Sequence, residues 1–192
     1  IVEEVIATIE NSGYNTVLDM CTGTGAIAIS VAHYTKAKVT ASDISSKALE
    51  VARENAKILN ADVNFIESDL FENINETFDV LVSNPPYIES EVIPTLMEQV
   101  KDYEPMLALD GGKDGLDFYR NIINQAKNYI NQNGCIVFEI GYNQGGQVKS
   151  LLENAGFVNI NVKQDLAGLD RLVIGFKLWY TDHIRTGGKK CL

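Results

Sequence analysis

A proline-containing stretch, VSNPPYIES, follows an apolar run and occupies residues 82–90. Pro85 and Pro86 carry no N–H, and each restricts the residue before it, so the turn is stiff and its carbonyls face no competing amide donors. Asn84 adds a side-chain carbonyl and an NH2 group, and Tyr87 adds an aromatic face. These residue types predict a cradle that accepts hydrogen bonds from a planar NH2 group.

Such a cradle suits the alkylation of a nitrogen that is a poor nucleophile. The lone pair of an amide or aromatic amine is delocalised, so attack requires an oriented nitrogen and stabilisation of the positive charge that develops. No strong general base is needed, because the alkylated nitrogen is acidic and loses its proton afterwards. We predict catalytic roles for Asn84, Pro85 and Tyr87, and substrate contacts from these residues and Pro86. The alternative is a rigid strand terminator without chemistry.

A glycine-rich segment earlier in the chain, LDMCTGTGAIAIS, predicts a ligand-binding loop. Gly23, Gly25 and Ala28 match the pattern G-x-G-x-x-[GA] between an expected strand and an expected helix, and Asp43 follows at the distance typical of a ribose-binding carboxylate. Glycines there let the backbone approach a ligand closely. The pattern alone fits a nicotinamide or flavin nucleotide as well as S-adenosylmethionine.

Asp19, just before this loop, favours S-adenosylmethionine. A carboxylate about 5 Å from a pyrophosphate charge costs roughly 3 kcal/mol at an effective dielectric near 20, whereas an ammonium and a sulfonium are attracted to it. We expect Asp43 to accept hydrogen bonds from the ribose hydroxyls and Asp69 to border the adenine. Leu70 and Phe71 are expected to pack on the adenine face.

Extended and helical patterns alternate along the chain, which predicts an α/β fold. Strands are expected at 16–20, 38–42, 63–68, 78–82, 135–140, 159–164 and 172–178, and helices at about 1–12, 26–34, 46–59, 114–132 and 147–154. The last two strands are close enough to pair antiparallel. We therefore predict a mostly parallel seven-stranded sheet with a C-terminal antiparallel hairpin and helices on both faces.

Four polar residues lie at or just beyond the ends of the first four expected strands. They are Asp19, Asp43, Asp69 and Asn84. Ligands in parallel sheets bind outside the carboxyl ends of the strands, so we expect these side chains to border one site. Asp and Asn also favour strand exits for local reasons, which is the alternative for any one of them.

Composition narrows the class of protein. Lys and Arg number 16 against 26 Asp and Glu, a net charge of −10, which argues against a phosphate backbone as a direct partner. Cys21, Cys135 and Cys191 are far apart, and His33 and His183 are isolated, so we expect neither a metal site nor a disulfide framework. No signal peptide or membrane span is recognisable. We predict a cytoplasmic protein, a monomer without a membrane partner.

Five segments together resemble the catalytic domain of bacterial release-factor glutamine methyltransferases, the PrmC/HemK family. They are DMCTGTGAIA, SNPPYI, DYEPMLALDGGKDGLDFYR, EIGYNQG and DLAGLDRLVIG, in this order. The resemblance covers nearly everything from Ile1 to about Lys177. The Asn-Pro-Pro-Tyr element alone is shared with amino-methyltransferases that act on DNA and RNA, and the later segments narrow the family.

The resemblance implies the fold of class I S-adenosylmethionine-dependent methyltransferases and a specific reaction. The reaction is N5 methylation of the glutamine in the Gly-Gly-Gln motif of class 1 peptide chain release factors, with S-adenosylhomocysteine as product. Alternatives of the same reaction type are a ribosomal-protein glutamine methyltransferase and a nucleic-acid adenine-N6 methyltransferase. An oxidoreductase is disfavoured by Asp19, and a donor-binding protein without activity is a further alternative.

The resemblance also implies residue roles. The methionyl part of the donor contacts Cys21, Thr22, Gly23, Thr24 and Gly25. The ribose contacts Asp43, and the adenine contacts Asp69 and Leu70. Asn84, which also borders the donor, and the Pro85 carbonyl hold the glutamine amide, with Tyr87 packing beside it.

The chain departs from the family pattern in three respects. The small N-terminal helical domain of the family and its Pro-Arg-Pro stretch are absent, Leu169 stands where an arginine is expected, and Leu70 occupies a position that is aromatic in some members. We expect a catalytic domain at residues 1–178, excised from a longer protein, and a polar tail at 179–192.

Overall fold

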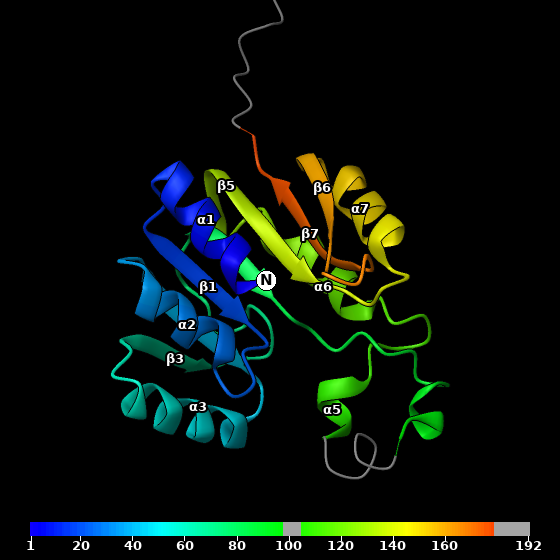
Figure 1. The fold of residues 1–192 in the computed structure, drawn as a ribbon, viewed down its shortest axis with the longest axis horizontal. Coiled ribbons are helices and arrows are strands. Elements are labelled where there is room, and N and C mark those ends of the chain that lie inside the picture. Colours follow the sequence, from blue (N-terminus) through cyan, green and yellow to red (C-terminus); the bar gives the residue numbers. More distant parts are fainter. Residues whose placement is uncertain (98–104, 179–192) are drawn as a thin grey trace, which may run out of the picture.

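The computed structural model describes residues 1–97 and 105–178, which form one seven-stranded sheet between two layers of helices (Figure 1). The strand order is β3-β2-β1-β4-β5-β7-β6. The strands are β1 (Thr16–Met20), β2 (Lys38–Asp43), β3 (Val63–Glu67), β4 (Phe78–Ser83), β5 (Ile130–Glu139), β6 (Val158–Gln164) and β7 (Asp170–Phe176). The helices are α1 (Val2–Ser12), α2 (Ala26–Tyr34), α3 (Ser46–Ile58), η1 (Ile93–Thr95), α5 (Met106–Leu109), α6 (Asp117–Ala126) and α7 (Gly145–Asn154).

The pairing confirms the mostly parallel sheet with an antiparallel C-terminal hairpin. Strands β1 to β5 pair in parallel, whereas β7 runs antiparallel to both β5 and β6. The carboxyl ends of β1 to β5 therefore meet at one edge of the sheet, and the loops that follow them lie together there.

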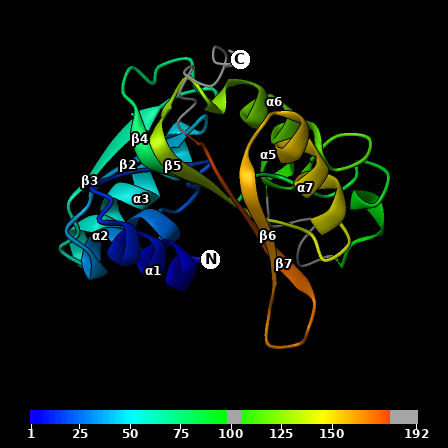
Figure 2. The same cartoon turned by 90° about the horizontal axis from the view of Figure 1, so that it is seen from above.

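The hydrophobic core lies on both faces of the sheet, because the direction of the side chains alternates along each strand. Val17 packs in a cluster with residues of α1 and α2, and the next residue, Leu18, packs in a second cluster with residues of α6 and α7. Successive strand side chains point to opposite faces, so both faces must be covered. Figure 2 shows α1 and α2 on one side of the sheet and α6 and α7 on the other.

Local signals set two of the helix boundaries. Gly13 ends α1 in the left-handed conformation, φ 69°, and its N–H donates to the Ile9 carbonyl at 2.9 Å. Ser45 caps α3, since its Oγ accepts from the Ala48 N–H at 3.2 Å. The sequence predicts the stop at Gly13 and leaves Ser45 and Ser46 open as the cap of α3.

The predicted helix over 114–132 was wrong at both ends. The sequence predicts Asp114 as its cap, Gly134 as its end, and a buried stripe at Leu116, Tyr119, Ile122, Ile123, Ala126 and Ile130. Helix α6 spans only Asp117–Ala126, Asp114 pairs with Arg120 instead, and Gly134 lies inside β5. The residues of the stripe are nevertheless buried.

Tertiary contacts explain why this helix stops early. The Tyr129 carbonyl accepts a hydrogen bond from the Phe78 N–H at 2.8 Å, and the Tyr129 ring stacks on Phe71 with centroids 4.3 Å apart. Ile130 then pairs with Phe78 and opens β5. Ile130 is buried as expected, but as a strand residue.

Other parts of the structure lie beyond what the sequence predicted. The short elements η1 and α5 had no counterpart among the expected elements. The predicted polar tail at 179–192 and Cys191 and His183 within it lie outside the described residues. No helix in the described part of the chain is long and apolar enough to cross a membrane.

Candidate active site

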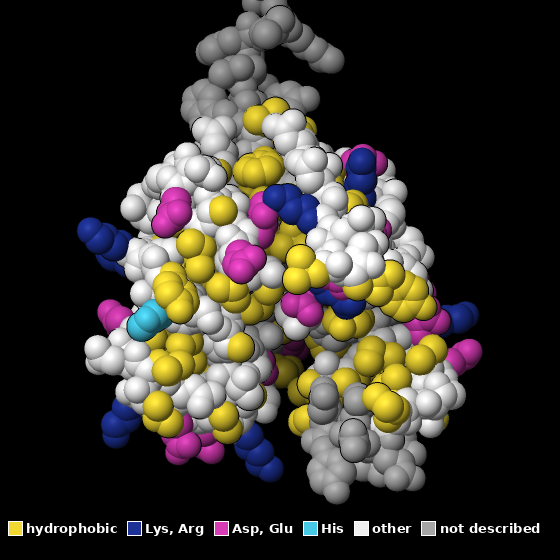
Figure 3. Space-filling view, in the orientation of Figure 1, with side chains coloured by type: hydrophobic (Ala, Val, Ile, Leu, Met, Phe, Trp, Pro, Cys, Tyr) yellow, Lys and Arg dark blue, Asp and Glu magenta, His cyan; other side chains and the backbone are white. Residues whose placement is uncertain are grey.

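A cavity of about 610 Å³ lies at the carboxyl ends of β1, β2, β3 and β4. Its walls include Ile27 of α2, Ala48 of α3 and Leu107 and Ala108 of α5. Figure 3 shows the molecule hollowed between the part that carries α2 and α3 and the part that carries α5. The loops after four neighbouring strands thus share one cavity.

Most of the residues predicted to bind a donor or a substrate line this cavity, and, apart from Phe71, four do not. The lining ones are Cys21, Thr22, Gly23, Thr24, Asp43, Asp69, Leu70, Asn84 and Pro86. The four outside the lining are Asp19, Gly25, Pro85 and Tyr87. Each of these four lies next to a lining residue in the chain or is bonded to one.

Asp19 is fully buried beneath the glycine loop. Its Oδ2 accepts from the Thr22 Oγ1 at 2.6 Å and from the Ala28 N–H at 3.0 Å, while Oδ1 has no hydrogen-bond partner among the described residues. Burial raises the pKa of Asp19 to about 7, although these two hydrogen bonds oppose the rise. The carboxyl group therefore ties the end of β1 to the start of α2 and shapes the loop from below.

Asp43 holds the same loop from the cavity side. Its Oδ2 accepts from the Gly23 N–H at 2.8 Å, and its Oδ1 accepts from the Ser45 N–H at 2.9 Å. A carboxylate has about four acceptor positions, so two backbone contacts leave capacity for hydroxyl groups of a ligand. Asp43 thus combines loop support with a free acceptor edge at the cavity.

Two residues without glycine's freedom adopt positive φ angles at the cavity wall, Cys21 with φ 58° and Leu70 with φ 47°. Such conformations cost energy and persist where surrounding contacts impose them, and they cluster at functional sites. Burial raises the pKa of the Cys21 thiol to about 12, so the thiol stays protonated near neutral pH. Cys21 is thereby a packing residue of the loop and not a thiolate nucleophile.

The turn after β4 presents Asn84 to the cavity. Asn84 is exposed and Pro85 and Pro86 are buried. Tyr87 is half-buried and packs against the core cluster that contains α6. The following residue, Ile88, exchanges two backbone hydrogen bonds with residues 109–111, of 3.0 and 2.8 Å. The turn is therefore fixed at its far end as well as by its two prolines.

Three apolar residues of the cavity wall were missed at the sequence level, namely Leu107, Ala108 and Phe118. They lie in the segments EPMLAL and GLDFYR, which carried a family resemblance. For Glu104 and Pro105 the sequence left two interpretations open, a place in the pocket wall or an ordinary loop. Pro105 lines the cavity, and Glu104 lies outside the described residues.

The expectation for Phe71 was wrong. Its side chain is 2% exposed and stacks on Tyr129 in the core, and only its neighbour Leu70 lines the cavity. Burying a whole aromatic ring is worth more than leaving it on a cavity wall, and the core offers Phe71 a stacking partner.

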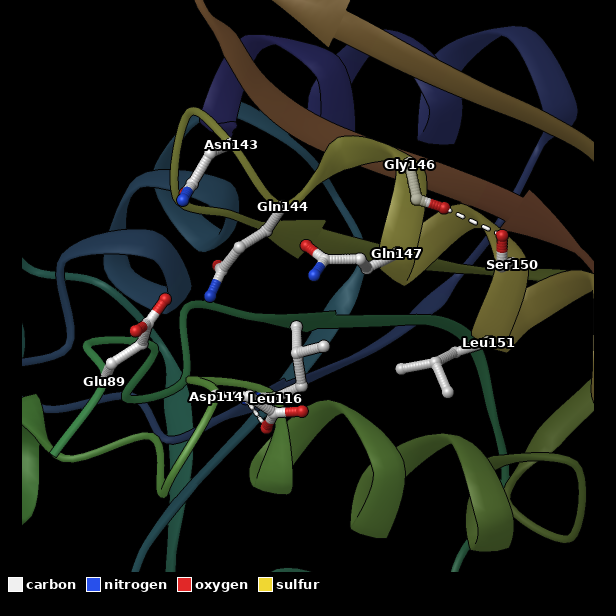
Figure 4. A pocket seen from close by; sticks show the side chains of 9 residues that line it. All are labelled: Glu89, Asp114, Leu116, Asn143, Gln144, Gly146, Gln147, Ser150 and Leu151. Atoms are coloured by element: carbon white, nitrogen blue, oxygen red, sulfur yellow. Dashed lines mark hydrogen bonds between the residues drawn. The ribbon is translucent and has the colours of Figure 1, made fainter.

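A second cavity, of about 570 Å³, lies beside the start of α7 (Figure 4). It was not predicted. It is lined by Glu89, Asp114, Leu116, Asn143, Gln144, Gly146, Gln147, Ser150 and Leu151. Among the described residues no group of three His, Cys, Asp or Glu side chains could hold a metal ion.

Strand order and cavity position define a class I S-adenosylmethionine-dependent methyltransferase fold. The crystal structure of a methyltransferase from Pyrococcus furiosus superposes with a TM-score of 0.69 at 20% identity, covering 93% of this chain and 83% of the other. Residues 3–111 match the family model described as the methyltransferase small domain. The chain belongs to that family.

Two curated relatives are more similar in sequence. The release factor glutamine methyltransferase of Clostridium acetobutylicum is 45% identical, and the match covers 92% of this chain and 64% of the relative. That of Fusobacterium nucleatum is 43% identical over 92% of this chain and 51% of the relative. The chain thus spans less than two thirds of the length of either relative.

Proposed function

We propose that the chain methylates the side-chain amide of glutamine, at N5, in the Gly-Gly-Gln motif of class 1 peptide chain release factors. One observation carries the proposal: Asn84, predicted to bind the amide, lines the same cavity as the glycine loop and Asp43. An acceptor for an NH2 group and a predicted donor site therefore share one space. The names of the two relatives support the release factor as substrate.

The cavity residues fit S-adenosylmethionine as the methyl donor. The volume of about 610 Å³ lies within the range typical of small-molecule sites. Ser42 Oγ is buried in its wall without a hydrogen-bond partner among the described residues, so the wall retains unused polar capacity. Asp43 and Asp69 suit hydroxyl and amino groups, and Leu70 and Phe118 suit a flat ring. The donor, when bound, supplies a methyl group on a cationic sulfur.

The residues of the chain then have separate tasks. Cys21 to Gly25 hold the methionyl part of the donor, Asp43 its ribose, and Asp69 with Leu70 its adenine, while Asp19 shapes the loop from beneath. The Asn84 side chain and the Pro85 carbonyl accept the two N–H hydrogens of the glutamine amide and orient its nitrogen. Pro86 and Tyr87 keep the turn stiff, Tyr87 from the core side.

Proton removal needs no side-chain base in this proposal. Among the described residues, those that line the cavity include no histidine. An amide nitrogen that has gained a methyl group is strongly acidic, so it releases its proton to water after transfer. The partner is the release factor, a protein, and we propose that the chain works as a cytoplasmic monomer.

The test is methylation of a purified class 1 release factor. The chain, S-adenosylmethionine and the release factor are incubated, and mass spectrometry maps the added mass. We expect one methyl group on the glutamine of the Gly-Gly-Gln motif, and none with a release factor in which that glutamine is alanine. An unmodified release factor, or methylation of a ribosomal protein or of adenine in nucleic acid instead, contradicts the proposal.

A further inference from the structure

Gln144, which Figure 4 shows just before α7, is a buried glutamine that joins three loops around the amide cradle. Gln144 is 4% exposed, and no role in donor or substrate binding falls to it. Its Nε2 donates to the Tyr87 carbonyl at 2.9 Å and to the Gly115 carbonyl at 3.2 Å. Its Oε1 accepts from the Gly141 N–H at 2.9 Å. One side chain thus connects the turn after β4, the loop before α6 and the turn after β5.

Burial makes these hydrogen bonds consequential. Both N–H groups of the Gln144 amide and its oxygen have partners, so burying the amide leaves no polar atom unpaired. Removing Nε2 would leave the carbonyls of Tyr87 and Gly115 without this donor inside the protein, and an unpaired buried group is costly. The surroundings therefore favour one orientation of the Gln144 amide and one position of Tyr87.

Glycines let the three loops come this close. Gly115 has φ +71°, and a Cβ there would lie 2.4 Å from the Tyr87 oxygen and 2.7 Å from Gln144 Nε2. A Cβ at Gly111 would lie 2.7 Å from Tyr87 Cα. Contacts under 3.0 Å cannot be accommodated without movement, so the Tyr87 backbone is enclosed as well as hydrogen-bonded.

On the basis of the proposed function, we infer that Gln144 is a positioning residue for amide methylation. It holds the Tyr87 carbonyl, and the two prolines before Tyr87 have fixed φ angles, which limits how far the turn can change direction. Fixing the position of Tyr87 therefore also restricts the positions of Asn84 and the Pro85 carbonyl. Both groups must face the cavity for in-line transfer of the methyl group. A displacement of about 1 Å in such a group can cost on the order of 100-fold in rate.

Two substitutions separate this role from a role limited to the turn after β5, where Gln144 only accepts from the Gly141 N–H. Gln144→Met removes all three hydrogen bonds at similar volume. Gln144→Glu keeps an acceptor for the Gly141 N–H but loses the donor to Tyr87 and Gly115. Gln147→Met and Gln147→Glu are the controls. Gln147 lies three residues further along the chain, in α7, lines the second cavity together with Gln144, and is exposed.

The first readout requires neither donor nor substrate. Hydrogen exchange of the segment 84–90 is followed by mass spectrometry in the full chain. We expect exchange at least about 10-fold faster in both Gln144 variants and unchanged exchange in both Gln147 controls, since local opening of the turn sets the rate. The second readout compares donor affinity by calorimetry with single-turnover methylation of a release factor. We expect donor affinity within about 2-fold of wild type and transfer about 100-fold slower.

Three results would overturn the inference. One is a Gln144→Glu variant whose hydrogen exchange and methyl transfer match wild type. The hydrogen bond to the Gly141 N–H would then be sufficient to hold the turn after β4, without the donor to Tyr87. Another is exchange in the Gln144 variants that matches the Gln147 controls. The third is an equal loss of thermal stability, donor affinity and transfer, which indicates general unfolding. A wild-type chain that methylates no release factor contradicts the proposed function alone, because the exchange rates still decide whether Gln144 holds the turn.

Discussion

Two aspartates at the same edge of the sheet have different surroundings and different tasks. Asp19 is fully buried and bonded to Thr22 and Ala28, whereas Asp43 borders the cavity and supports Gly23. Burial penalises the ionised form of Asp19, so the protein stabilises its neutral form. Asp43 keeps acceptor positions directed at the cavity. Equivalent places in the sheet thus produce one carboxyl group buried beneath the loop and one that borders the cavity.

The pKa of Asp19 predicts how stability depends on pH. Its pKa is raised from 3.8 to about 7 in the folded protein by burial. The native state therefore binds more protons than the unfolded state between these values, and this contribution to stability is complete below about pH 4 and is lost as pH rises through about 7. An asparagine side chain cannot ionise, so for Asp19→Asn the free energy of unfolding relative to wild type should increase from about pH 4 to about pH 8. Urea unfolding at a series of pH values measures this difference, and a constant difference would contradict the prediction.

Asn84 and Asp43 should separate transfer from donor binding. In Asn84→Ala the acceptor for the substrate amide is lost, so we expect methyl transfer to fall by about 100-fold or more with donor affinity nearly unchanged. In Asp43→Ala the ribose contact is lost, so donor affinity should fall first, by about 10-fold or more. Calorimetry with the donor and single-turnover rates measure the two quantities. Equal losses of donor affinity and transfer rate in Asn84→Ala would contradict the role of Asn84 in holding the substrate amide. Unchanged donor affinity in Asp43→Ala would contradict the role of Asp43 in binding the ribose.

At the scale of elements, the sequence predicted those parts of the site that strand order determines. Asp43, Asp69 and Asn84 lie at or just after the ends of the parallel strands β2, β3 and β4, and such strands must place their carboxyl ends together. Most strand boundaries were predictable because short apolar runs bounded by turn residues mark them locally. The fold followed from the pattern of elements.

What the sequence could not predict depends on contacts between distant segments. Ile130 fits a helical stripe as well as a strand, and only its pairing with Phe78 decides the matter. Gln144 follows a strand and so resembles an ordinary turn residue, although the fold buries it against Tyr87. Phe118 gave no periodic signal of its position on the cavity wall. Such roles become visible only when the loops are placed in space.

The loop before α6 should be intolerant of any side chain at Gly115. Its φ of +71° alone disfavours alanine by about 1–3 kcal/mol, and a Cβ 2.4 Å from the Tyr87 oxygen adds steric repulsion. We expect Gly115→Ala to lower the free energy of unfolding by at least about 2 kcal/mol. Gly146→Ala is the control, because Gly146 has no atom within 4 Å of its would-be Cβ and lies in α7. Urea denaturation compares the two variants, and similar losses in both would show that the close approach at Tyr87 is unimportant.

At the scale of the whole molecule, the sheet joins the two halves of the chain. The first half carries strands β1, β2, β3 and β4, and the second half carries β5, β6 and β7. The pairing of β4 with β5 connects these two halves, and the core clusters on both faces of the sheet contain residues from both. The cavity is shared as well, since Cys21 and Asn84 line it together with Leu107 and Phe118. Neither half has a complete core or a complete site.

This continuity predicts that residues 1–178 unfold in a single cooperative step. Circular dichroism and tyrosine fluorescence should give the same urea midpoint, since one core serves all seven strands. S-adenosylmethionine should shift that transition as a whole, by about 2.7 kcal/mol at a concentration about 100 times its dissociation constant, because its site draws residues from both halves. Two separate transitions, or a donor that shifts only one of the two probes, would show that the cavity is formed by one half alone.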